Sequence, residues 1–558
     1  CLEPSRRSRK ENADLSRIDG HTLVAQSLRR LGVTHVYCVA GTPIRETFSK
    51  CAELGIRPIG VRNQHAGVLM AIAQNYVSGR IAAVALFSAG PAVTNAATGI
   101  LVAWDNCWPL VLLGGRRPLN MRGMGSFQDL DASVLFQSIT KWSAVVEKTS
   151  QIPRCVEQAF QIAISGRPGP VYLDLPEDVL TATSHPSVDP ANVTLNIRPL
   201  DENGIDAAAE LLLRAQRPAM IIGKGVRWSE PYAELRRLAD EFEIPFITSP
   251  MGRGYLPDDH PRCFNNARSL LQHKADVVLL LGARLDWTFR FGSQIARDAQ
   301  IIQIDIHEPE IGVNRAPTIG IVGDVKLVMQ QLLARMANKF SDAPQKNLLP
   351  WHTVLEAERE SKQRKLDTQM NSAAAPMSPH SLFKEIKDFM PRDAICILDG
   401  NISMAAGQQV LPAHLPASRF TAGSNGCMGV GVPFAVGAKI AQPQRMVIAV
   451  CGDMGFALSA MDMETAVRHK IPIIVVVVNN EGNSGAILQK TLFPSFEERI
   501  TMFQPDIHYE NIMRAFGGHA EHVDRPEQLR PALERAVASG KAACINVNVD
   551  PFAPYPTE

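Results

Sequence analysis

The chain has 558 residues, which is enough for three or four domains of ordinary size. Hydrophobic residues make up 46% and charged residues 20%, the balance of a globular protein with a sizeable core. The formal net charge of +1 gives no field that would attract nucleic acid, and no apolar run approaches the ~20 residues of a membrane span. The ten cysteines form no CxxC pair, which predicts reduced thiols and a cytoplasmic location, with the peroxisome as the alternative.

The N-terminal part of the chain has the pattern of a basic tail followed by an α/β domain. Residues 1–17 have no hydrophobic core of the kind that a signal peptide carries, and we expect them to be disordered. From 18 to 185, strand-like runs alternate with helical stretches, and small residues follow each strand. This alternation predicts a doubly wound parallel sheet with function at the carboxyl ends of its strands. The predicted strands are His35–Val39, Arg57–Val61, Ile81–Phe87 and Pro109–Gly114.

A second domain of the same kind is predicted from 193 to 337. Its strand-like segments fit a six-stranded Rossmann-like pattern without a GxGxxG fingerprint. They include Pro218–Gly223, Ile244–Thr248, Ala275–Leu281 and Ile301–Ile306. Residues 338–378 are predicted to be a linker, because loop-like composition flanks the charged segment Trp351–Leu366, which should form a solvated covering helix.

The third predicted domain covers residues 379–558 and begins with a helix at Ser381–Phe389. Between two of its strands we expect one amphipathic helix, with Met461 and Met463 on the same face as Ala466 and Val467. The whole chain is thus predicted to be an α/β protein with three doubly wound parallel-sheet domains. The strand segments of this domain are Ala394–Leu398, Met446–Val450 and Ile473–Val478, with Tyr509–Phe516 and Ala543–Val549 completing the sheet.

The strongest chemical signal lies between Gly452 and Asn480. One strand ends in Gly452-Asp453-Met454-Gly455, and the next ends at Asn480. Because parallel strands end at the same edge of a sheet, Asp453 and Asn480 should face one crevice. The glycines let a phosphate approach the backbone, and carboxylate and amide oxygens suit Mg²⁺. The alternative interpretation is an ordinary strand–helix–strand unit with an aspartate at a strand end.

This stretch resembles the thiamine diphosphate motif, which is GDG followed by NN, with Met454 replacing the last glycine. The resemblance implies that Asp453, Asn480 and the backbone carbonyl of Gly482 bind Mg²⁺. Longer segments resemble 2-hydroxyacyl-CoA lyases and oxalyl-CoA decarboxylases of the acetohydroxyacid synthase-like superfamily; they include VRNQHAGVLMAIAQNY, SAGPAVTNAATG and ADVVLLLGARLDWTFRFG. From about residue 18 to 550, the resemblance implies pyrimidine-binding, central and diphosphate-binding domains. It also implies a homodimer or homotetramer with active sites at the dimer interface.

Gln64 stands where this family has a glutamate that hydrogen-bonds the pyrimidine ring of the cofactor. An amide can form the hydrogen bond but cannot exchange a proton near neutral pH, so cofactor activation should be slower by about 10²–10⁴. Three explanations are open. Gln64 is an isosteric substitution introduced to trap a bound species, or a natural residue in an enzyme that tolerates slow activation, as glyoxylate carboligase does. The third is that catalysis was lost and binding kept.

Two further residues are assigned to the substrate side by the resemblance. Gln128 matches the lyases, where the decarboxylases have a glutamate, and it would hydrogen-bond the substrate; a surface-loop glutamine is the alternative. The tyrosine that follows the NN pair in the family is absent, which leaves Ser484 as a more distant hydroxyl.

The resemblance also places residues of the third domain around the cofactor. Gly426 and Met428 fall in the segment beneath the thiazolium ring, where Met428 would hold the cofactor bent; an ordinary core methionine is the alternative. Asn401 and Ser403 are candidates for contacting the diphosphate.

In this family the central domain holds a non-catalytic ADP or lies near the nucleotide end of CoA. By position, Lys224 and Arg284 would contact phosphates, and Asp305 and Asp324 would contact ribose or adenine groups. The alternative for Asp305 is a strand-end residue that caps a turn. FAD, which the related acetohydroxyacid synthases hold here, is the less favoured ligand.

Together these features predict a thiamine diphosphate-dependent C–C lyase or carboligase that acts on a 2-hydroxyacyl-CoA or a related 2-oxo compound. The alternatives are a specialised biosynthetic carboligase with a non-CoA substrate and a catalytically weak, cofactor-binding regulatory homologue. The expected partners are a small-molecule substrate and further copies of this chain, and nucleic acid is not among them.

Overall fold

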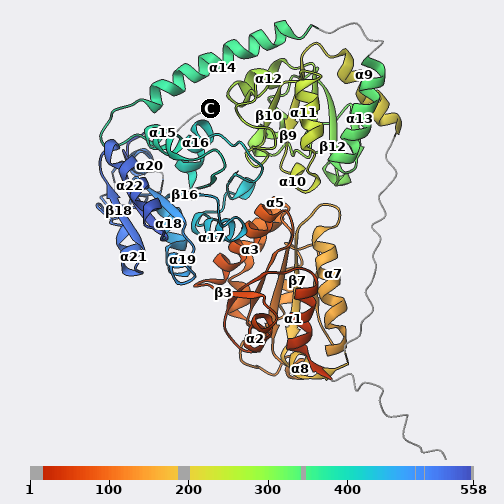
Figure 1. Cartoon of the computed structure of the whole chain (residues 1–558), viewed down its shortest axis with the longest axis vertical. Helices are drawn as coiled ribbons and strands as arrows, with labels where there is room; N and C mark the ends of the chain where they lie inside the picture. Colours follow the sequence, from red (N-terminus) through yellow and green to blue (C-terminus); the bar gives the residue numbers. More distant parts are fainter. Residues whose placement is uncertain (1–16, 186–201, 341–346, 484, 496, 554–558) are drawn as a thin grey trace, which may run out of the picture.

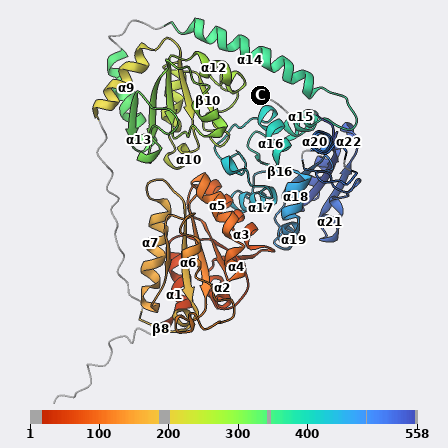
Figure 2. The ribbon, with the colours of Figure 1, turned by 180° about the vertical axis from the view of Figure 1, so that it is seen from behind.

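The computed structural model describes residues 17–185, 202–340, 347–483, 485–495 and 497–553. The predicted N-terminal tail, apart from Arg17, lies outside these residues. Three α/β domains follow one another along the chain, each built on its own parallel sheet with helices on both faces (Figures 1 and 2). The predicted fold class is therefore confirmed.

The first domain has a six-stranded sheet in the order β3-β2-β4-β5-β7-β6, and neighbouring strands are parallel throughout. A small antiparallel pair, β1 (Ile18–Asp19) with β8 (Thr183–Ser184), joins the two ends of the domain. The sheet strands are β2 (His35–Val39), β3 (Arg57–Gly60), β4 (Ala83–Phe87), β5 (Leu110–Arg116), β6 (Ser143–Val145) and β7 (Pro170–Pro176). The helices are α1 (Gly20–Arg30), α2 (Arg45–Glu53), α3 (Gln64–Ser78), α4 (Pro91–Thr94), α5 (Ala97–Asn106), α6 (Ala132–Leu135), α7 (Ile152–Ile164) and α8 (Glu177–Thr181).

The central domain has a parallel sheet in the order β10-β9-β11-β12-β13. The six-strand prediction is wrong for the described residues, which contain five strands here. Helix α13 continues beyond the predicted domain end at 337. The strands are β9 (Pro218–Ile222), β10 (Phe246–Thr248), β11 (Val277–Leu281), β12 (Gln300–Asp305) and β13 (Ile319–Val322). The helices are α9 (Glu202–Arg214), α10 (Val226–Ser229), α11 (Tyr232–Asp240), α12 (Arg268–Lys274) and α13 (Val325–Phe340).

The predicted covering helix is α14 (Leu349–Met370), which runs along the outside of the central and third domains (Figure 1). Its charged residues face water, while Trp351 and Leu355 are buried in the central core. The Trp351 indole Nε1 donates a hydrogen bond to the Pro218 carbonyl at 3.0 Å. The helix therefore ties the two domains together.

The third domain has a six-stranded parallel sheet in the order β15-β14-β16-β17-β19-β18. The strands are β14 (Ile395–Asp399), β15 (Arg419–Phe420), β16 (Val447–Gly452), β17 (Ile474–Asn479), β18 (His519–Val523) and β19 (Ala543–Asn548). The helices are α15 (Pro379–Phe389), α16 (Asn401–Val410), α17 (Gly431–Ala441), α18 (Asp453–Ser459), α19 (Met463–Arg468), α20 (Gly485–Leu492), α21 (Glu510–Ala515) and α22 (Pro526–Ala538).

Two predictions for the third domain are wrong. The expected single amphipathic helix is divided into α18, a 3₁₀ turn at Ala460–Asp462, and α19, and this turn leaves Met461 half exposed while Met463 is buried. The segment Tyr509–Phe516 is helical, as α21, and the edge strand of the sheet is β18 instead. Both errors arise in short apolar stretches, whose pattern fits the period of a helix as well as that of a strand.

The first and third domains share one hydrophobic core, at the contact between α3 and α17. A Cβ at Gly437 would lie 2.2 Å from the carbonyl oxygen of Met70, so only glycine lets the two helices approach this closely. Beside them, the ring of Tyr76 stacks on Trp108 with the centroids 4.4 Å apart. This contact fixes the two sheets whose carboxyl edges carry the predicted site residues.

Candidate active site

Asp453 is the buried centre of the predicted motif. It follows β16 and begins α18, and its side chain is 1% exposed. Its Oδ1 accepts a hydrogen bond from the Met454 N–H at 2.7 Å, and its Oδ2 accepts one from the Gly482 N–H at 2.8 Å. Gly482 belongs to the loop after β17, the parallel neighbour of β16. The predicted meeting of two strand ends at one edge is thus present.

A cavity of about 280 Å³ opens at this edge. It brings together the strand end of β16, the first turn of α16, Met428 and the loop after β17. Every lining residue belongs to the third domain. The lining consists of Gly400, Asn401, Ile402, Met428, Gly452, Asp453, Met454, Gly455, Asn480, Gly482, Asn483, Ile487, Leu488, Thr491 and Ala553.

Three predicted residues of the third domain are not among those lining residues. Ser403 is fully buried, and its Oγ finds no hydrogen-bond partner among the described residues. Gly426 is exposed, with φ +68° and open space where a Cβ would point. Ser484 lies outside the described residues, although its neighbour Asn483 lines the cavity.

The donor set of this cavity fits a divalent cation with a diphosphate. Burial raises the pKa of the Asp453 carboxyl to about 7, because the charged form has lost water. Among the described residues no cationic side chain forms a salt bridge with it. A carboxylate in this position, with the Asn480 side chain beside it, can hold Mg²⁺ through oxygen. The N-terminus of α16, a helix of ten residues, also opens on the cavity and favours phosphate oxygens there.

Asp399 is a positioning residue that the sequence analysis missed. It ends β14 and is 1% exposed. Its carboxylate accepts hydrogen bonds from the N–H groups of Gly429 at 3.2 Å and Gly431 at 2.8 Å. These bonds fix the loop that carries Met428 to the sheet edge. The available signal was an aspartate at the end of an apolar strand, directly before Gly400.

We expect Asp399→Ala to weaken binding of thiamine diphosphate by roughly 10–100-fold. The substitution leaves two buried N–H groups unpaired, at about 1–3 kcal/mol each, and frees the Met428 loop. Titration of the tryptophan fluorescence with the cofactor measures the effect. Asp399→Asn keeps one acceptor oxygen, so its cofactor affinity should lie between those of the wild type and Asp399→Ala. Asp388→Ala, on the exposed face of α15, is the control. Equal affinities for Asp399→Ala and the control would contradict the assignment.

Gln64 and Gln128 lie at the carboxyl edge of the first sheet, at opposite ends of α4. Gln64 is the first residue of α3, and its Oε1 accepts a hydrogen bond from Asn95, which follows α4, at 3.2 Å. Gln128 has φ +59° and packs against Gly90, which precedes α4; a Cβ on Gly90 would lie 2.9 Å from the Gln128 Cβ. Neither glutamine lines the cavity at Asp453.

The four predicted residues of the central domain line one cavity of about 660 Å³, between the central and first domains. The Lys224 Nζ and the Arg284 guanidinium both donate to the backbone carbonyl of Asp105, at 2.8 and 3.1 Å. Asp305 accepts a hydrogen bond from the His307 N–H at 2.9 Å, and Asp324 accepts one from the Ser229 hydroxyl at 2.9 Å. Asp305 therefore does cap a turn, as its alternative interpretation predicted, and it still lines the cavity.

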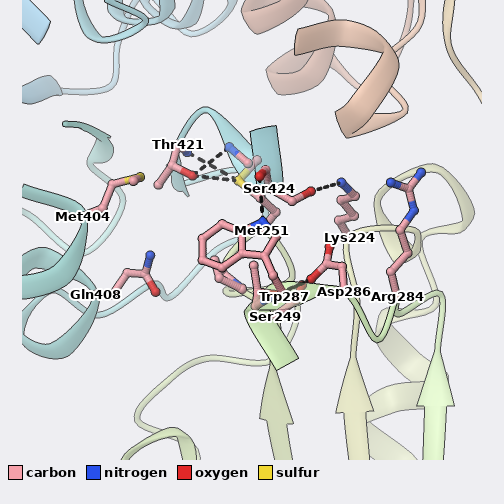
Figure 3. Close-up of a pocket in the computed structure, with 13 residues that line it drawn as sticks. Lys224, Ser249, Met251, Arg284, Asp286, Trp287, Met404, Gln408, Thr421 and Ser424 are labelled. Carbon is pink, nitrogen blue, oxygen red and sulfur yellow. Dashed lines mark hydrogen bonds between the residues drawn. The ribbon is translucent and has the colours of Figure 1, made fainter. Parts of the chain in front are cut away.

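Lys224 also reaches the third domain. Figure 3 shows its ammonium group beside Ser424, at 3.4 Å, in a smaller cavity between the central and third domains. The indole of Trp287 donates to the Ser424 carbonyl at 2.8 Å, and the Ser424 hydroxyl donates to the Asp105 carboxylate at 2.8 Å. Ser424 precedes the Met428 loop, so the central domain is linked through this segment to the cavity at Asp453.

Comparison with known proteins defines the class. The thiamine pyrophosphate enzyme models match all three domains: the N-terminal TPP binding domain at residues 18–135, the central domain at 205–332 and the C-terminal TPP binding domain at 400–547. The chain belongs to the thiamine pyrophosphate enzyme family and is a thiamine diphosphate-dependent enzyme.

Individual relatives refine this placement. The chain is 34% identical to 2-hydroxyacyl-CoA lyase 1 of Mus musculus, over 97% of this chain and 96% of the lyase. It is 33% identical to an acetolactate synthase large subunit of Mycobacterium tuberculosis, over 96% of each chain. It is 29% identical to oxalyl-CoA decarboxylase of Escherichia coli, over 97% of this chain and 96% of the decarboxylase. The predicted family resemblance is confirmed. Within the described residues, no helix has the length and apolarity needed to cross a membrane.

Proposed function

We propose that this chain is a thiamine diphosphate-dependent C–C lyase or carboligase that acts on a 2-hydroxyacyl-CoA or a related 2-oxo compound. The observation that carries the proposal is the Asp453–Asn480 cavity in a chain with nearly full-length similarity to 2-hydroxyacyl-CoA lyases. When bound, thiamine diphosphate supplies an electron sink for the breaking or forming of a bond next to a carbonyl carbon.

The residues of the third domain serve as the anchor in this proposal. Asp453, Asn480 and the Gly482 carbonyl would hold Mg²⁺, which would supply positive charge for the diphosphate oxygens. Asn401, at the start of α16, lies where it can contact the diphosphate. Met428, on the loop bound by Asp399, would pack against the thiazolium ring of the cofactor.

In this proposal the residues of the first domain contact the pyrimidine ring of the cofactor and the substrate. Gln64 hydrogen-bonds the pyrimidine ring, and Gln128 orients the substrate carbonyl or hydroxyl, with Ser484 assigned to the same side. Because Gln64 and Gln128 are not among the residues that line the Asp453 cavity, a complete site combines the first domain of one chain with the third domain of another. We therefore propose a homodimer, or a tetramer of two such dimers.

Exposed apolar side chains supply a surface for that association. Met124 is 75% exposed and Phe127 is 69% exposed, in the segment that carries Gln128. Leu458 in α18 and Met461 in the 3₁₀ turn after it are also exposed, in the segment that begins at Asp453. Apolar groups lie next to both the Gln128 segment and the Asp453 segment, and this favours their burial against a second copy of the chain.

The central cavity is proposed to hold an ADP or the nucleotide end of CoA, with FAD as the less favoured ligand. Lys224 and Arg284 supply two cations toward phosphate oxygens, and both already point at an oxygen, the Asp105 carbonyl. Asp305 and Asp324 supply acceptors for ribose hydroxyls or an adenine amino group.

A carboligase with a non-CoA substrate is the second candidate function. It is favoured by the similarity to an acetolactate synthase, which is nearly as high as that to the lyases, and by the small residues Asn483 and Ser484 after the NN pair. A catalytically weak regulatory homologue is the third, because Gln64 removes the proton-exchanging carboxyl.

Incubation of the full chain with thiamine diphosphate, Mg²⁺ and a 2-hydroxyacyl-CoA tests the proposal. Cleavage of the bond between the thioester carbonyl and the hydroxyl-bearing carbon yields an aldehyde and formyl-CoA, and a coupled dehydrogenase assay detects the aldehyde. We expect slow release that Asp453→Asn abolishes. Turnover of a 2-oxo acid without any CoA cleavage would favour the second candidate instead. Bound cofactor without turnover of either substrate class, in this chain and in Gln64→Glu, would contradict the proposal.

A further inference from the structure

Three metal-binding side chains lie together at the carboxyl edge of the third sheet, outside the cofactor cavity. His508 precedes α21, Glu510 begins α21, and His522 lies near the end of edge strand β18. One ligand atom from each of them lies within 4.8 Å of the other two. We propose that His508, Glu510 and His522 form a second metal site, which binds a divalent transition-metal ion such as Zn²⁺.

The buried carboxylate of Glu510 is the centre of this cluster. Its side chain is only 3% exposed, and its two oxygens face different imidazoles. Oε1 lies 2.8 Å from Nδ1 of His508, and Oε2 lies 3.7 Å from Nδ1 of His522. Ligand atoms around a tetrahedral Zn²⁺ are about 3.3 Å apart, given metal–ligand bonds of about 2.0 Å. The two observed distances lie on either side of this value. Small side-chain rotations would therefore bring the three ligand atoms to the spacing of a zinc site.

The hydrogen bonds behind His522 resemble those of a metal-ligating histidine. Its Nε2 lies 2.8 Å from Oδ1 of Asp524, which also accepts a hydrogen bond from Asn548 at 2.9 Å. A carboxylate partner on one ring nitrogen keeps the proton there and leaves the lone pair of the other nitrogen for a metal. Here that lone pair is on Nδ1, which faces Glu510.

Asn546 is a buried amide next to the cluster, and no described residue satisfies its oxygen. Its side chain is fully buried, and its Oδ1 has no hydrogen-bond partner among the described residues. Its Nδ2 lies 3.1 Å from Oε2 of Glu510 and 3.2 Å from Nδ1 of His522. An unpaired buried carbonyl oxygen costs about 1–3 kcal/mol. A half-turn of this amide would present Oδ1 to an ion between Glu510 and His522 as a fourth donor, in exchange for the hydrogen bond that Nδ2 donates to the Ile507 carbonyl at 3.1 Å.

The ligand chemistry and the exposure select the kind of ion. Two imidazoles and one carboxylate suit Zn²⁺ and its neighbours in the transition series, whereas Mg²⁺ prefers a shell of oxygens. The His508 side chain is 50% exposed, so an ion can enter from that side and keep a bound water. None of the three residues lines the cavity at Asp453. The site is therefore distinct from the one proposed for Mg²⁺.

Equilibrium dialysis of the tag-free full chain tests this site. The chain is first saturated with thiamine diphosphate and Mg²⁺, and then dialysed against Zn²⁺ alone or Co²⁺ alone. We expect one tightly held ion per chain and, with Co²⁺, the visible absorption of a tetrahedral complex. We also expect bound Zn²⁺ to raise the Tm, because the ion joins α21 to the edge strand.

Ligand variants separate this site from adventitious binding. His522→Ala and the more exposed His508→Ala should each weaken Zn²⁺ binding tenfold or more and remove the Co²⁺ absorption. His519→Ala is the matched control, since His519 is on the same strand but pairs with Glu521 at 3.0 Å. The proposal would be overturned if the wild-type chain bound no more Zn²⁺ than the ligand variants, or if His519→Ala lost as much Zn²⁺ binding as they do.

Discussion

Asp453→Asn is expected to lower the Mg²⁺-dependent affinity for thiamine diphosphate by roughly 10²–10³ and to abolish turnover. The substitution keeps the shape of the side chain but removes the negative charge of Asp453, the one carboxyl among the described residues that line the cavity between β16 and β17. Loss of one partner from a buried ionic contact costs about 3–5 kcal/mol. Isothermal titration with the cofactor, with and without Mg²⁺, measures the change.

Asp462→Asn is the matched control for this experiment. Asp462 is equally buried, and burial raises its pKa to about 6, but its Oδ1 accepts hydrogen bonds from the Arg62 N–H and the Thr465 hydroxyl. An asparagine oxygen can accept both. We expect near-normal cofactor affinity for this control, and wild-type affinity in Asp453→Asn would show that the metal and diphosphate bind elsewhere.

Gln64→Glu is expected to raise turnover by about 10²–10⁴. An amide at this position can hydrogen-bond the pyrimidine ring but cannot exchange a proton with it, whereas a carboxyl can. Steady-state rates of the two proteins, each saturated with cofactor and Mg²⁺, measure the effect. Gln64→Ala is the control, because it removes the hydrogen bond without adding a carboxyl and should lower cofactor affinity.

The outcome also separates one of the three explanations for Gln64, a natural residue that slows activation, from the other two. A large increase is expected if glutamine was introduced as an isosteric trap or if catalysis decayed around an intact site. An unchanged or lower rate would contradict the prediction. It would then favour the explanation that Gln64 is natural and that the enzyme tolerates slow activation.

The sequence was most informative about strands that are buried on both faces of a sheet. Ile474–Asn479 is apolar almost throughout because it is buried on both faces, so its strand was predictable. Asp453 and Asn480 were predictable as neighbours because each directly follows such a strand. The half-exposed strand His519–Val523 gave no comparable signal, because its polar and apolar residues follow neither the period of a strand nor that of a helix.

Contacts between distant segments could not be predicted in the same way. The hydrogen bonds that Asp399 accepts from the N–H groups of Gly429 and Gly431 span about thirty residues and depend on how β14 and α17 pack. The grouping of His508, Glu510 and His522 likewise depends on α21 being helical, where a strand was expected. Local patterns identify the ends of elements, whereas tertiary packing decides which ends meet.

A crystal structure of the full chain with thiamine diphosphate and Mg²⁺ tests the central claim most directly. We predict that each cofactor lies between two copies of the chain, with two such sites in a dimer. Its metal should contact Asp453, Asn480 and the Gly482 carbonyl of one chain, and its pyrimidine ring should contact Gln64 of the other. A cofactor held within a single chain, or a metal without contact to Asp453, would contradict this account.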